Sequence, residues 1–542
     1  MTETDTLPPS DSNSRLADSA ISQARNHKTL AAASRARWAV LLIAVPFALQ
    51  AIAYLRVLLQ LIVARNEAGY PEGVCVYGFL TAAQTNTLYL PPFNFPWNAQ
   101  IYGPLFLMVG AFFAKIFHGD PTPTTVLMRV LSFAALMGSM ALIAYLCWRL
   151  ERRKSWAAVA VIMGFACFWL IPYSAAARPD TPSIFLLLAA LVTYQLAEGR
   201  GWIFFLAGVF GALSFLTKQS TAPLLLALFI DCLWARRFKG AAIFVAGGVI
   251  ASAPVLGFLW FRHEPFLANF TVVKLAIRDW SSVPRTVMSF VLVNQIAVIS
   301  ICIALMGVGL SWKEKKYRSI LLVTAFACLS HVAALANPGA GWHYTILPWL
   351  LMMLFVPAGL RLLERWAVRQ LWIPAALLVL ATIILIHQRS LLVRKPLTEL
   401  DASVVGNLNM LSDVPYLELR SRQPQLLDPF LYNELSKQRV WSDEPIRQGI
   451  DAEAYDLLLI GGKDGTSDSE FLVAGFRGTS LWGADVVREM TLHYRVLCET
   501  SDHVALVPLD RTSSLRTEDI AEIFNQPCRL TDRRPQVSPG SS

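Results

Sequence analysis

The sequence predicts a polytopic α-helical membrane domain followed by a small soluble α/β domain. Of the 542 residues, 55% are hydrophobic and only 16% are charged, and the mean hydropathy is +0.47. A soluble protein carries about 25% charged residues. Apolar runs dominate residues 35–390, whereas the composition from residue 396 onward is that of a soluble protein. These observations place the membrane domain at 35–390 and the soluble domain at 396–510.

The N-terminal residues 1–34 are rich in Ser, Asp and Thr, which predicts a disordered tail. No cleavable signal peptide precedes the first apolar run. Arg25, Lys28, Arg35 and Arg37 come before that run. Because basic residues stay on the cytoplasmic side of a membrane, we expect an uncleaved anchor with its tail in the cytoplasm.

Twelve apolar runs have about the length that a bilayer requires. They lie at about 38–62, 103–118, 124–148, 156–173, 181–197, 202–217, 219–234, 241–261, 286–309, 319–336, 343–362 and 371–388. Basic residues gather in the connecting segments 149–154, Arg200, 235–240, 313–318 and 361–369.

The run at 103–118 decides the topology. If it crosses the membrane, all of these basic segments fall on the side opposite the basic tail. If it lies at the outer interface, they all share the side of the tail, as the positive-inside rule favours. We therefore expect about eleven spans, with 103–118 as a juxtamembrane helix. The first outer loop then covers 63–123, and the soluble domain lies outside the cytoplasm.

The first outer loop is long, aromatic and proline-rich, and it carries the acids Glu67 and Glu72. Loops of this length are usually functional or disordered, and aromatic residues disfavour disorder. A carboxylate near the membrane surface among Tyr70, Tyr77 and Tyr89 suits a general base. The alternative is a solvated loop acid. The sequence favours Glu72 as the base and leaves Glu67 open.

Two further charged positions fall on the same predicted face. Arg178 and Asp180 sit at the mouth of one span, and Lys218 lies between two short spans. Asp180 could simply cap the helix that follows it, and Lys218 could extend harmlessly to the interface. In the functional interpretation, Lys218 and Arg178 bind a phosphate, and Asp180 holds a divalent cation such as Mg or Mn.

Aromatic and polar residues complete this predicted outer-face pocket. His343 and Tyr344 follow Trp342 at the start of a span, where an interfacial aromatic belt is the alternative explanation. The loop 262–285 offers a polar, aromatic set that could cover a substrate, namely His263, Glu264, Lys274, Arg278, Asp279 and Trp280.

The soluble domain shows strand-like and helical segments in alternation, which predicts a small α/β fold. The strand-like segments are 423–428, 455–462, 494–499 and 503–508, and the helical ones are 431–438 and 483–493. We expect residues 511–542 to form a mobile tail. Cys498 and Cys528 could form a disulfide if this domain faces an oxidising compartment.

Composition also excludes some classes of function. The formal net charge of +9 is explained by basic loops next to the membrane, so no nucleic-acid partner is implied. The eight cysteines are scattered and form no CxxC or Cys/His cluster, so a zinc site is not predicted.

The order of these motifs resembles that of the bacterial GT-C glycosyltransferases. The segments are PEGVCVYGFLTAAQTNTLYLPP, IYGPLF, ARPD and LTKQS, and a soluble C-terminal domain follows them. In outline they are similar to protein O-mannosyltransferase-like and aminoarabinose-transferase-like enzymes. The resemblance covers about residues 60–390. It implies the GT-C fold, with juxtamembrane helices in the first outer loop, in a bacterial inner membrane.

The resemblance also implies an activity and its site. Family enzymes transfer a sugar from a polyprenyl-phosphate donor to an acceptor hydroxyl with inversion. By position, Glu72 matches the catalytic acid, Asp180 a second acid and Lys218 a lysine of the Thr-Lys segment. Pro71 stands where relatives carry another acid. Tyr102-Gly103-Pro104 matches a family Tyr-Pro-Pro motif, which adds Tyr102 to the substrate-binding candidates Tyr77, Glu264, His343 and Tyr344.

Two other classes of function remain open from the sequence. A transporter or lipid-linked sugar flippase would show paired half-repeats, interrupted helices and charges near mid-membrane. Asp231 is the best candidate for such a charge. A non-catalytic glycan-assembly protein on the same scaffold would not need its outer acids. The sugar and the acceptor, whether glycan, lipid or protein, are not indicated.

Overall fold

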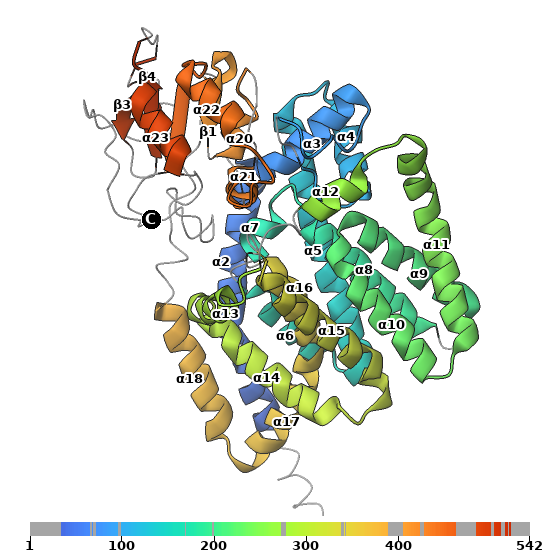
Figure 1. Ribbon diagram of the computed structural model, residues 1–542. Helices are drawn as coiled ribbons and strands as arrows, with labels where there is room; N and C mark the ends of the chain where they lie inside the picture. Colours follow the sequence, from blue (N-terminus) through green and yellow to red (C-terminus); the bar gives the residue numbers. More distant parts are fainter. Residues whose placement is uncertain are drawn as a thin grey trace, which may run out of the picture.

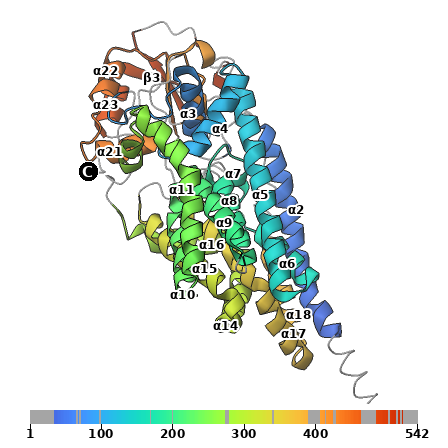
Figure 2. The ribbon, with the colours of Figure 1, turned by 90° about the vertical axis from the view of Figure 1, so that its right-hand side faces the viewer.

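The computed structural model shows a tall helical body that carries a small sheet domain at one end (Figures 1 and 2). It describes residues 34–387 and 405–521, apart from gaps at 65–67, 69–71, 96–98, 168–169, 198–199, 273–277, 338–340, 342, 413, 423–427, 462–483, 500–502, 511–514, 517 and 519. Of the predicted tails at 1–34 and 511–542, only residues 34, 515, 516, 518, 520 and 521 are described.

Each of the twelve predicted apolar runs corresponds to a helix or a pair of helices. In chain order these and their neighbours are α2 (Ala44–Val63), α3 (Glu72–Thr85), α4 (Pro104–Ile116), α5 (Pro121–Glu151), α6 (Lys154–Phe165), α7 (Leu170–Ser174), α8 (Asp180–Leu196), α9 (Gly201–Thr217), η1 (Gln219–Thr221), α10 (Ala222–Trp234), α11 (Phe238–Phe261), α12 (Phe266–Val272), α13 (Ser282–Val293), α14 (Gln295–Ser311), η3 (Lys315–Tyr317), α15 (Arg318–Leu335), α16 (His343–Met352), η4 (Met353–Phe355), α17 (Val356–Arg369) and α18 (Trp372–His387).

Five of the described helical stretches are long and apolar enough to cross a membrane by themselves: Ser34–Val63, Pro121–Glu151, Phe238–Phe261, Lys315–Leu335 and His343–Arg369. Six shorter apolar helices accompany them. The chain is therefore a multi-pass membrane protein, and the number of crossings stays a prediction.

One predicted span is wrong as a single helix. The run at 286–309 is divided at Asn294 into α13 and α14, which meet at an angle of 103°. Asn294 leaves the helical conformation, and its side-chain amide donates to the carbonyl of Phe290. A side chain that competes for helix carbonyls in this way ends the helix.

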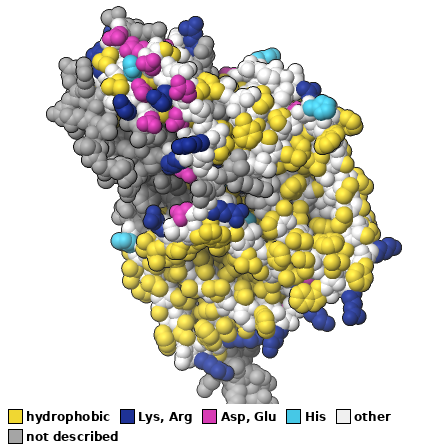
Figure 3. Space-filling model, in the orientation of Figure 1, with side chains coloured by type: hydrophobic (Ala, Val, Ile, Leu, Met, Phe, Trp, Pro, Cys, Tyr) yellow, Lys and Arg dark blue, Asp and Glu magenta, His cyan; other side chains and the backbone are white. Residues whose placement is uncertain are grey.

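The helical body has two distinct ends, which we call the domain end and the basic end. The domain end carries the sheet domain, with α3 and α4 beside it (Figures 1 and 2). Lys and Arg side chains line the opposite, basic end below a broad apolar band (Figure 3). Ion pairs connect separate elements there, including Arg153 with Glu364 of α17 and Lys316 with Glu151 of α5. The basic loops thus share one face, as the charge pattern predicts.

Close packing of small residues holds helices together within the apolar band. α9 and α11 lie side by side, and a Cβ added at Gly208 would come within 1.9 Å of the backbone oxygen of Phe244. Membrane helices gain much of their association from such close backbone approach, because lipid offers no hydrophobic driving force between helices.

The C-terminal domain has a four-stranded sheet in the order β1-β2-β4-β3. Its elements are η5 (Val405–Asn407), β1 (Met410–Ser412), α20 (Pro415–Glu418), α21 (Pro429–Ser436), α22 (Glu444–Asp451), β2 (Leu457–Gly461), α23 (Ala484–His493), β3 (Tyr494–Glu499) and β4 (His503–Pro508). β1 and β2 pair in parallel, with Leu411 opposite Leu458, and the other pairs are antiparallel.

The predicted strands at 455–462, 494–499 and 503–508 are confirmed, as are the helices at 431–438 and 483–493. β1 has only three residues, too few for an alternating pattern, and the sequence did not indicate it. The strand predicted at 423–428 lies almost wholly outside the described residues. Cys498 is disulfide-bonded, and Cys528 lies outside the described residues.

The sheet domain packs directly on the first outer loop. The indole nitrogen of Trp441 donates to the carbonyl oxygen of Pro92 at 2.9 Å. Ala99 belongs to the same buried apolar cluster as Trp441 and Leu458. The loop is therefore held between the helical body and the C-terminal domain.

Candidate functional site

The segment of the first outer loop that precedes α4 is fastened to the C-terminal end of α9. The backbone amide of Gly103 donates to the carbonyl oxygen of Thr217 at 3.3 Å, and the side-chain amide of Gln219 donates to the carbonyl oxygen of Ile101 at 2.7 Å. A Cβ added at Gly103 would lie 2.0 Å from the backbone oxygen of Leu216. Only glycine permits this approach, which explains why a glycine interrupts the Tyr-Pro-Pro-like motif.

This junction places Tyr102 against a buried charge cluster. Tyr102 is 6% exposed and lies close enough to Arg178 and Asp180 for electrostatic interaction. Burial raises the pKa of Tyr102 well above its usual value, and the positive charge of Arg178 opposes that rise. The phenol therefore stays protonated and offers a hydrogen-bond donor.

The Asp180 cluster consists of Arg178, Asp180 and Lys218, all of them nearly inaccessible to solvent. The Arg178 Nε donates to one Asp180 oxygen at 3.0 Å, and the Lys218 ammonium donates to the other at 2.5 Å. Asp180 opens α8, and Lys218 follows the last residue of α9 in an extended conformation. Two cationic side chains thus converge on one carboxylate where α8 and α9 meet beneath the first loop.

Burial lowers the pKa of the Lys218 ammonium below its usual value, and the attraction of Asp180 opposes this effect. The nearby charge of Arg178 lowers it further. A group bearing negative charge would therefore be favoured beside Lys218, because it would offset both the desolvation and the repulsion from Arg178.

Aromatic rings surround the cations of the cluster. Arg178 lies 4.9 Å from the ring centre of Tyr173, and Lys218 lies 5.0 Å from that of Tyr344. The His343 ring is 5.2 Å from Tyr173 and 4.3 Å from Tyr344. His343 Nδ1 is buried and has no hydrogen-bond partner among the described residues. This nitrogen adds a polar group to the aromatic surroundings of the cluster.

Glu72 lies at the start of α3, fully buried, in a second network. Arg129, from α5, donates to both of its oxygens, at 2.8 and 2.6 Å. The amides of Ala68 and Ala177 donate to the same carboxylate at 2.8 and 2.6 Å. The alternative explanation, a solvated loop acid, is therefore wrong, because the carboxylate is fully buried and accepts from four donors.

The two networks are adjacent in the chain and in space. Ala177, whose amide Glu72 holds, immediately precedes Arg178. Arg129 also donates to the carbonyls of Leu61 and Ala64 at the end of α2. Glu72 thus holds the backbone segment from which the Arg178 side chain reaches Asp180.

Sequence reasoning missed Arg129, Tyr173 and His331. Arg129 carried a usable signal, because a lone charge inside an apolar run is expensive in a membrane unless it is paired. His331 faces the Tyr344 ring at 5.8 Å, and its Nδ1 lies 2.8 Å from the backbone oxygen of Ala327. A histidine inside an apolar helix carries the same kind of signal, because it is also rare in membrane spans.

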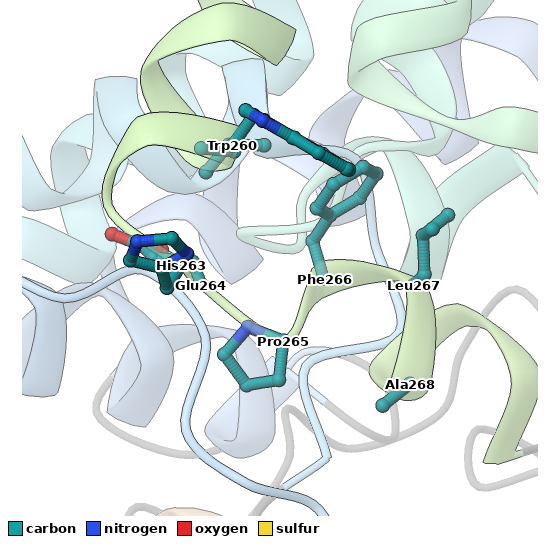
Figure 4. A pocket seen from close by; sticks show the side chains of 8 residues that line it. Trp260, His263, Glu264, Pro265, Phe266, Leu267 and Ala268 are labelled. Atoms are coloured by element: carbon teal, nitrogen blue, oxygen red, sulfur yellow. The ribbon is translucent and has the colours of Figure 1, made fainter.

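Glu264 lies away from the charge cluster and supports the first loop. One of its oxygens accepts from the amides of Leu88 and Tyr89, at 2.9 and 3.2 Å. The Tyr89 hydroxyl in turn donates to the carbonyl oxygen of Tyr102 at 2.7 Å. Glu264 also borders a separate pocket of about 240 Å³ between Trp260, His263 and Phe266 (Figure 4). It positions the loop that carries Tyr102.

The remaining candidates contribute less to this site. Tyr77 is partly buried and packs in the apolar cluster around α3 and α4. Asp279 is exposed and bonds to Ser281. Glu67, Lys274 and Trp342 lie outside the described residues.

A divalent cation at Asp180 does not fit the residues present. Both oxygens of Asp180 are engaged by cationic side chains. No group of three or more His, Cys, Asp or Glu side chains suited to a metal ion occurs among the described residues. Calcium and magnesium sites require several oxygen ligands, and this cluster supplies one carboxylate between two positive charges.

Comparison with solved structures finds two enzymes with a similar arrangement. The oligosaccharyltransferase of Archaeoglobus fulgidus, solved with Zn and sulfate, matches with a TM-score of 0.37 and 14% identity over 64% of this chain and 52% of that chain. The chain thus spans about half the length of the archaeal enzyme. ArnT from Cupriavidus metallidurans, solved with undecaprenyl phosphate, matches with a TM-score of 0.38 and 11% identity over 86% of this chain and 99% of that chain.

Both enzymes are GT-C glycosyltransferases, the family that the sequence motifs resemble. The archaeal enzyme has also been solved with an inhibitory peptide and a dolichol-phosphate, and this form matches with a TM-score of 0.39 and 12% identity over 64% of this chain and 55% of that chain. No protein-family model and no curated protein sequence matches the chain.

Proposed function

We propose that this protein is an integral-membrane glycosyltransferase that uses a polyprenyl-phosphate sugar as donor. The observation that carries the proposal is the buried pair of cations, Arg178 and Lys218, that converges on a single carboxylate. A buried charge is costly unless it is compensated. The phosphate of a lipid-linked sugar would interact favourably with both cations.

The cluster suits stabilisation of a leaving phosphate. As the bond between the sugar and the phosphate breaks, negative charge grows on the phosphate oxygens. Lys218 and Arg178 are already fixed by Asp180 and need little reorganisation, which is the condition under which such groups lower a barrier most. His343 and the phenol of Tyr102 add polar groups beside them. Attack by an acceptor oxygen opposite the phosphate would invert the anomeric carbon.

Glu72 remains the proposed general base, and the geometry sets one condition for this role. Its carboxylate must first leave at least one of the four donors that hold it. If Glu72 instead acts only as a support, His343 is the second candidate, because it lies within electrostatic reach of Asp180 and its Nδ1 has no hydrogen-bond partner among the described residues. The acceptor hydroxyl, whether on a glycan, a lipid or a protein, would be deprotonated by one of these two groups.

The proposal is tested by profiling polyprenyl-phosphate sugars by mass spectrometry in cells that lack the protein. Wild type, Lys218→Met and Lys115→Met are each returned to these cells. Lys115 lies in α4 and bonds to Asn86, so Lys115→Met is a matched loss of one lysine charge in the first-loop region. We expect one lipid-linked sugar to accumulate without the protein and with Lys218→Met, and not with Lys115→Met.

Removing one such charge-stabilising donor costs about 10²–10³ in rate. Full rescue by Lys218→Met at wild-type membrane levels would contradict the assigned role of the cluster. An unchanged lipid-linked sugar profile in cells without the protein would contradict the function itself.

The structure gives the transporter alternative little support. Asp231 lies at the basic end, where it pairs with Arg318 at 2.6 Å and accepts from the Tyr194 hydroxyl at 2.6 Å. It is therefore a helix-end ion pair and not a charge at mid-membrane. The bend between α13 and α14 is the only broken span in the described part of the chain, so no paired, symmetry-related break accompanies it there.

A further inference from the structure

A second, strongly basic pocket lies at the basic end of the helical body, away from the proposed catalytic cluster. Its volume is about 380 Å³. The ends of α5, α8 and α10 meet the beginnings of α11 and α15 around it. Its polar lining consists of Arg149, Arg152, Tyr194, Gln195, Asp231, Arg237, Lys315, Lys316, Arg318 and Ser319.

Some of these cations already have protein partners. Arg318 pairs with Asp231 at 2.6 Å, and Lys316 pairs with Glu314 at 3.1 Å and Glu151 at 3.4 Å. Arg149 donates to the backbone oxygen of Gln195. These contacts build the walls of the pocket.

The other three cations, Arg152, Arg237 and Lys315, have no carboxylate partner among the described residues. All three are exposed, and they come from three separate connections. Arg152 follows α5, Arg237 precedes α11, and Lys315 opens the turn before α15. Three like charges that face one hollow repel one another, and an anion between them would relieve this repulsion.

Tryptophans mark the depth of this pocket relative to a membrane. Trp148, Trp202, Trp234 and Trp312 are between 37% and 69% exposed, and each sits at or next to a helix end on the basic side. Exposed tryptophans gather where lipid headgroups meet the hydrocarbon. The pocket therefore lies at the level of the lipid phosphates.

We propose that this pocket binds the phosphate of an anionic lipid. Basic loops alone would be explained by membrane topology, and cations at helix C-terminal ends by the helix dipole. Neither explanation requires that three cations from separate loops, none with a carboxylate partner among the described residues, converge on one hollow. Pockets of this kind between helix ends bind anionic headgroups.

The experiment compares two triple variants of the full-length protein in detergent. Arg152→Ala/Arg237→Ala/Lys315→Ala removes these three cations. Arg236→Ala/Lys239→Ala/Lys313→Ala removes the same charge from exposed residues of the same end that do not line the pocket. Binding of phosphatidylglycerol, with phosphatidylcholine as the neutral comparison, is measured by native mass spectrometry. Soluble glycerol phosphate serves as competitor.

Each Lys or Arg near an anionic lipid contributes about fivefold in affinity, so the pocket variant should bind phosphatidylglycerol about 100-fold more weakly. The control variant should stay within about fivefold of wild type. Competition by glycerol phosphate would support recognition of the phosphate group, which the soluble ester shares with the lipid headgroup. Equal weakening in both variants, or weakening in neither, would overturn the proposal.

Discussion

Replacing Arg129 by methionine should destabilise the helical body by about 3–5 kcal/mol, because it leaves a buried carboxylate without its partner. Arg129 and Glu72 are both fully buried, and Arg129 supplies two of the four donors to that carboxylate. The backbone oxygens of Leu61 and Ala64 would lose a donor as well. The two backbone amides that remain on Glu72 cannot replace a full positive charge.

The companion variants separate the ion pair from the rest of the packing. Glu72→Gln leaves Arg129 uncompensated and should also destabilise. In Glu72→Gln/Arg129→Met neither charge remains, so the double variant should be about 2 kcal/mol more stable than the sum of the single effects predicts. Arg153→Met is the matched control, because Arg153 is 44% exposed in its pair with Glu364. Such exposed pairs contribute about 0–1 kcal/mol.

The assay is the temperature at which half of the detergent-solubilised protein remains monodisperse after heating, measured by fluorescence-detected size-exclusion chromatography. We expect Arg129→Met to lose several degrees, Arg153→Met to lose little, and the double variant to recover part of the loss. An Arg129→Met protein as stable as Arg153→Met, or strictly additive single effects, would refute the role of this ion pair as a structural support.

Gly103→Ala should reduce stability by about 1–3 kcal/mol in the same heating assay, because its methyl group meets a backbone oxygen. Gly257→Ala is the control and should be nearly neutral, because a Cβ there meets no atom within 4 Å. Equal losses of stability in the two variants would contradict this account. Glu264→Gln should weaken the hold on the first loop and speed limited proteolysis within 86–98, with Glu444→Gln, whose side chain is 58% exposed, as the control; an unchanged cleavage rate would count against the anchor. Affinity for polyprenyl phosphate should fall as pH rises, because Lys218 loses its proton. Burial lowers the pKa of Lys218, so the fall should start at lower pH than for an ordinary lysine, whose pKa is about 10.4. Lys218→Arg should remove this fall, and an identical pH profile in both proteins would argue against this role of Lys218.

Local properties of the chain predicted most of the architecture. Each apolar run became helical because a long stretch of apolar residues must satisfy its own backbone hydrogen bonds in lipid. The positive-inside rule, applied to the charges of the sequence alone, predicted that the basic loops share one end, and they do. β2, β3 and β4 were predicted from short apolar strand patterns. The bend at Asn294 was not, because it depends on one side chain within an otherwise continuous apolar run.

The sequence predicted which residues belong to the candidate site, and it did not predict which of them contact one another. By itself the sequence marked Glu72, Arg178, Asp180 and Lys218 as charges that fall on one face, because hydropathy and charge placement are readable residue by residue. Only the tertiary structure decided which of them meet. Lys218 reaches Asp180 across 38 positions, whereas Glu72 bonds to Arg129 across 57. Partner choice over such separations depends on how helices pack, and packing is a property of the whole fold.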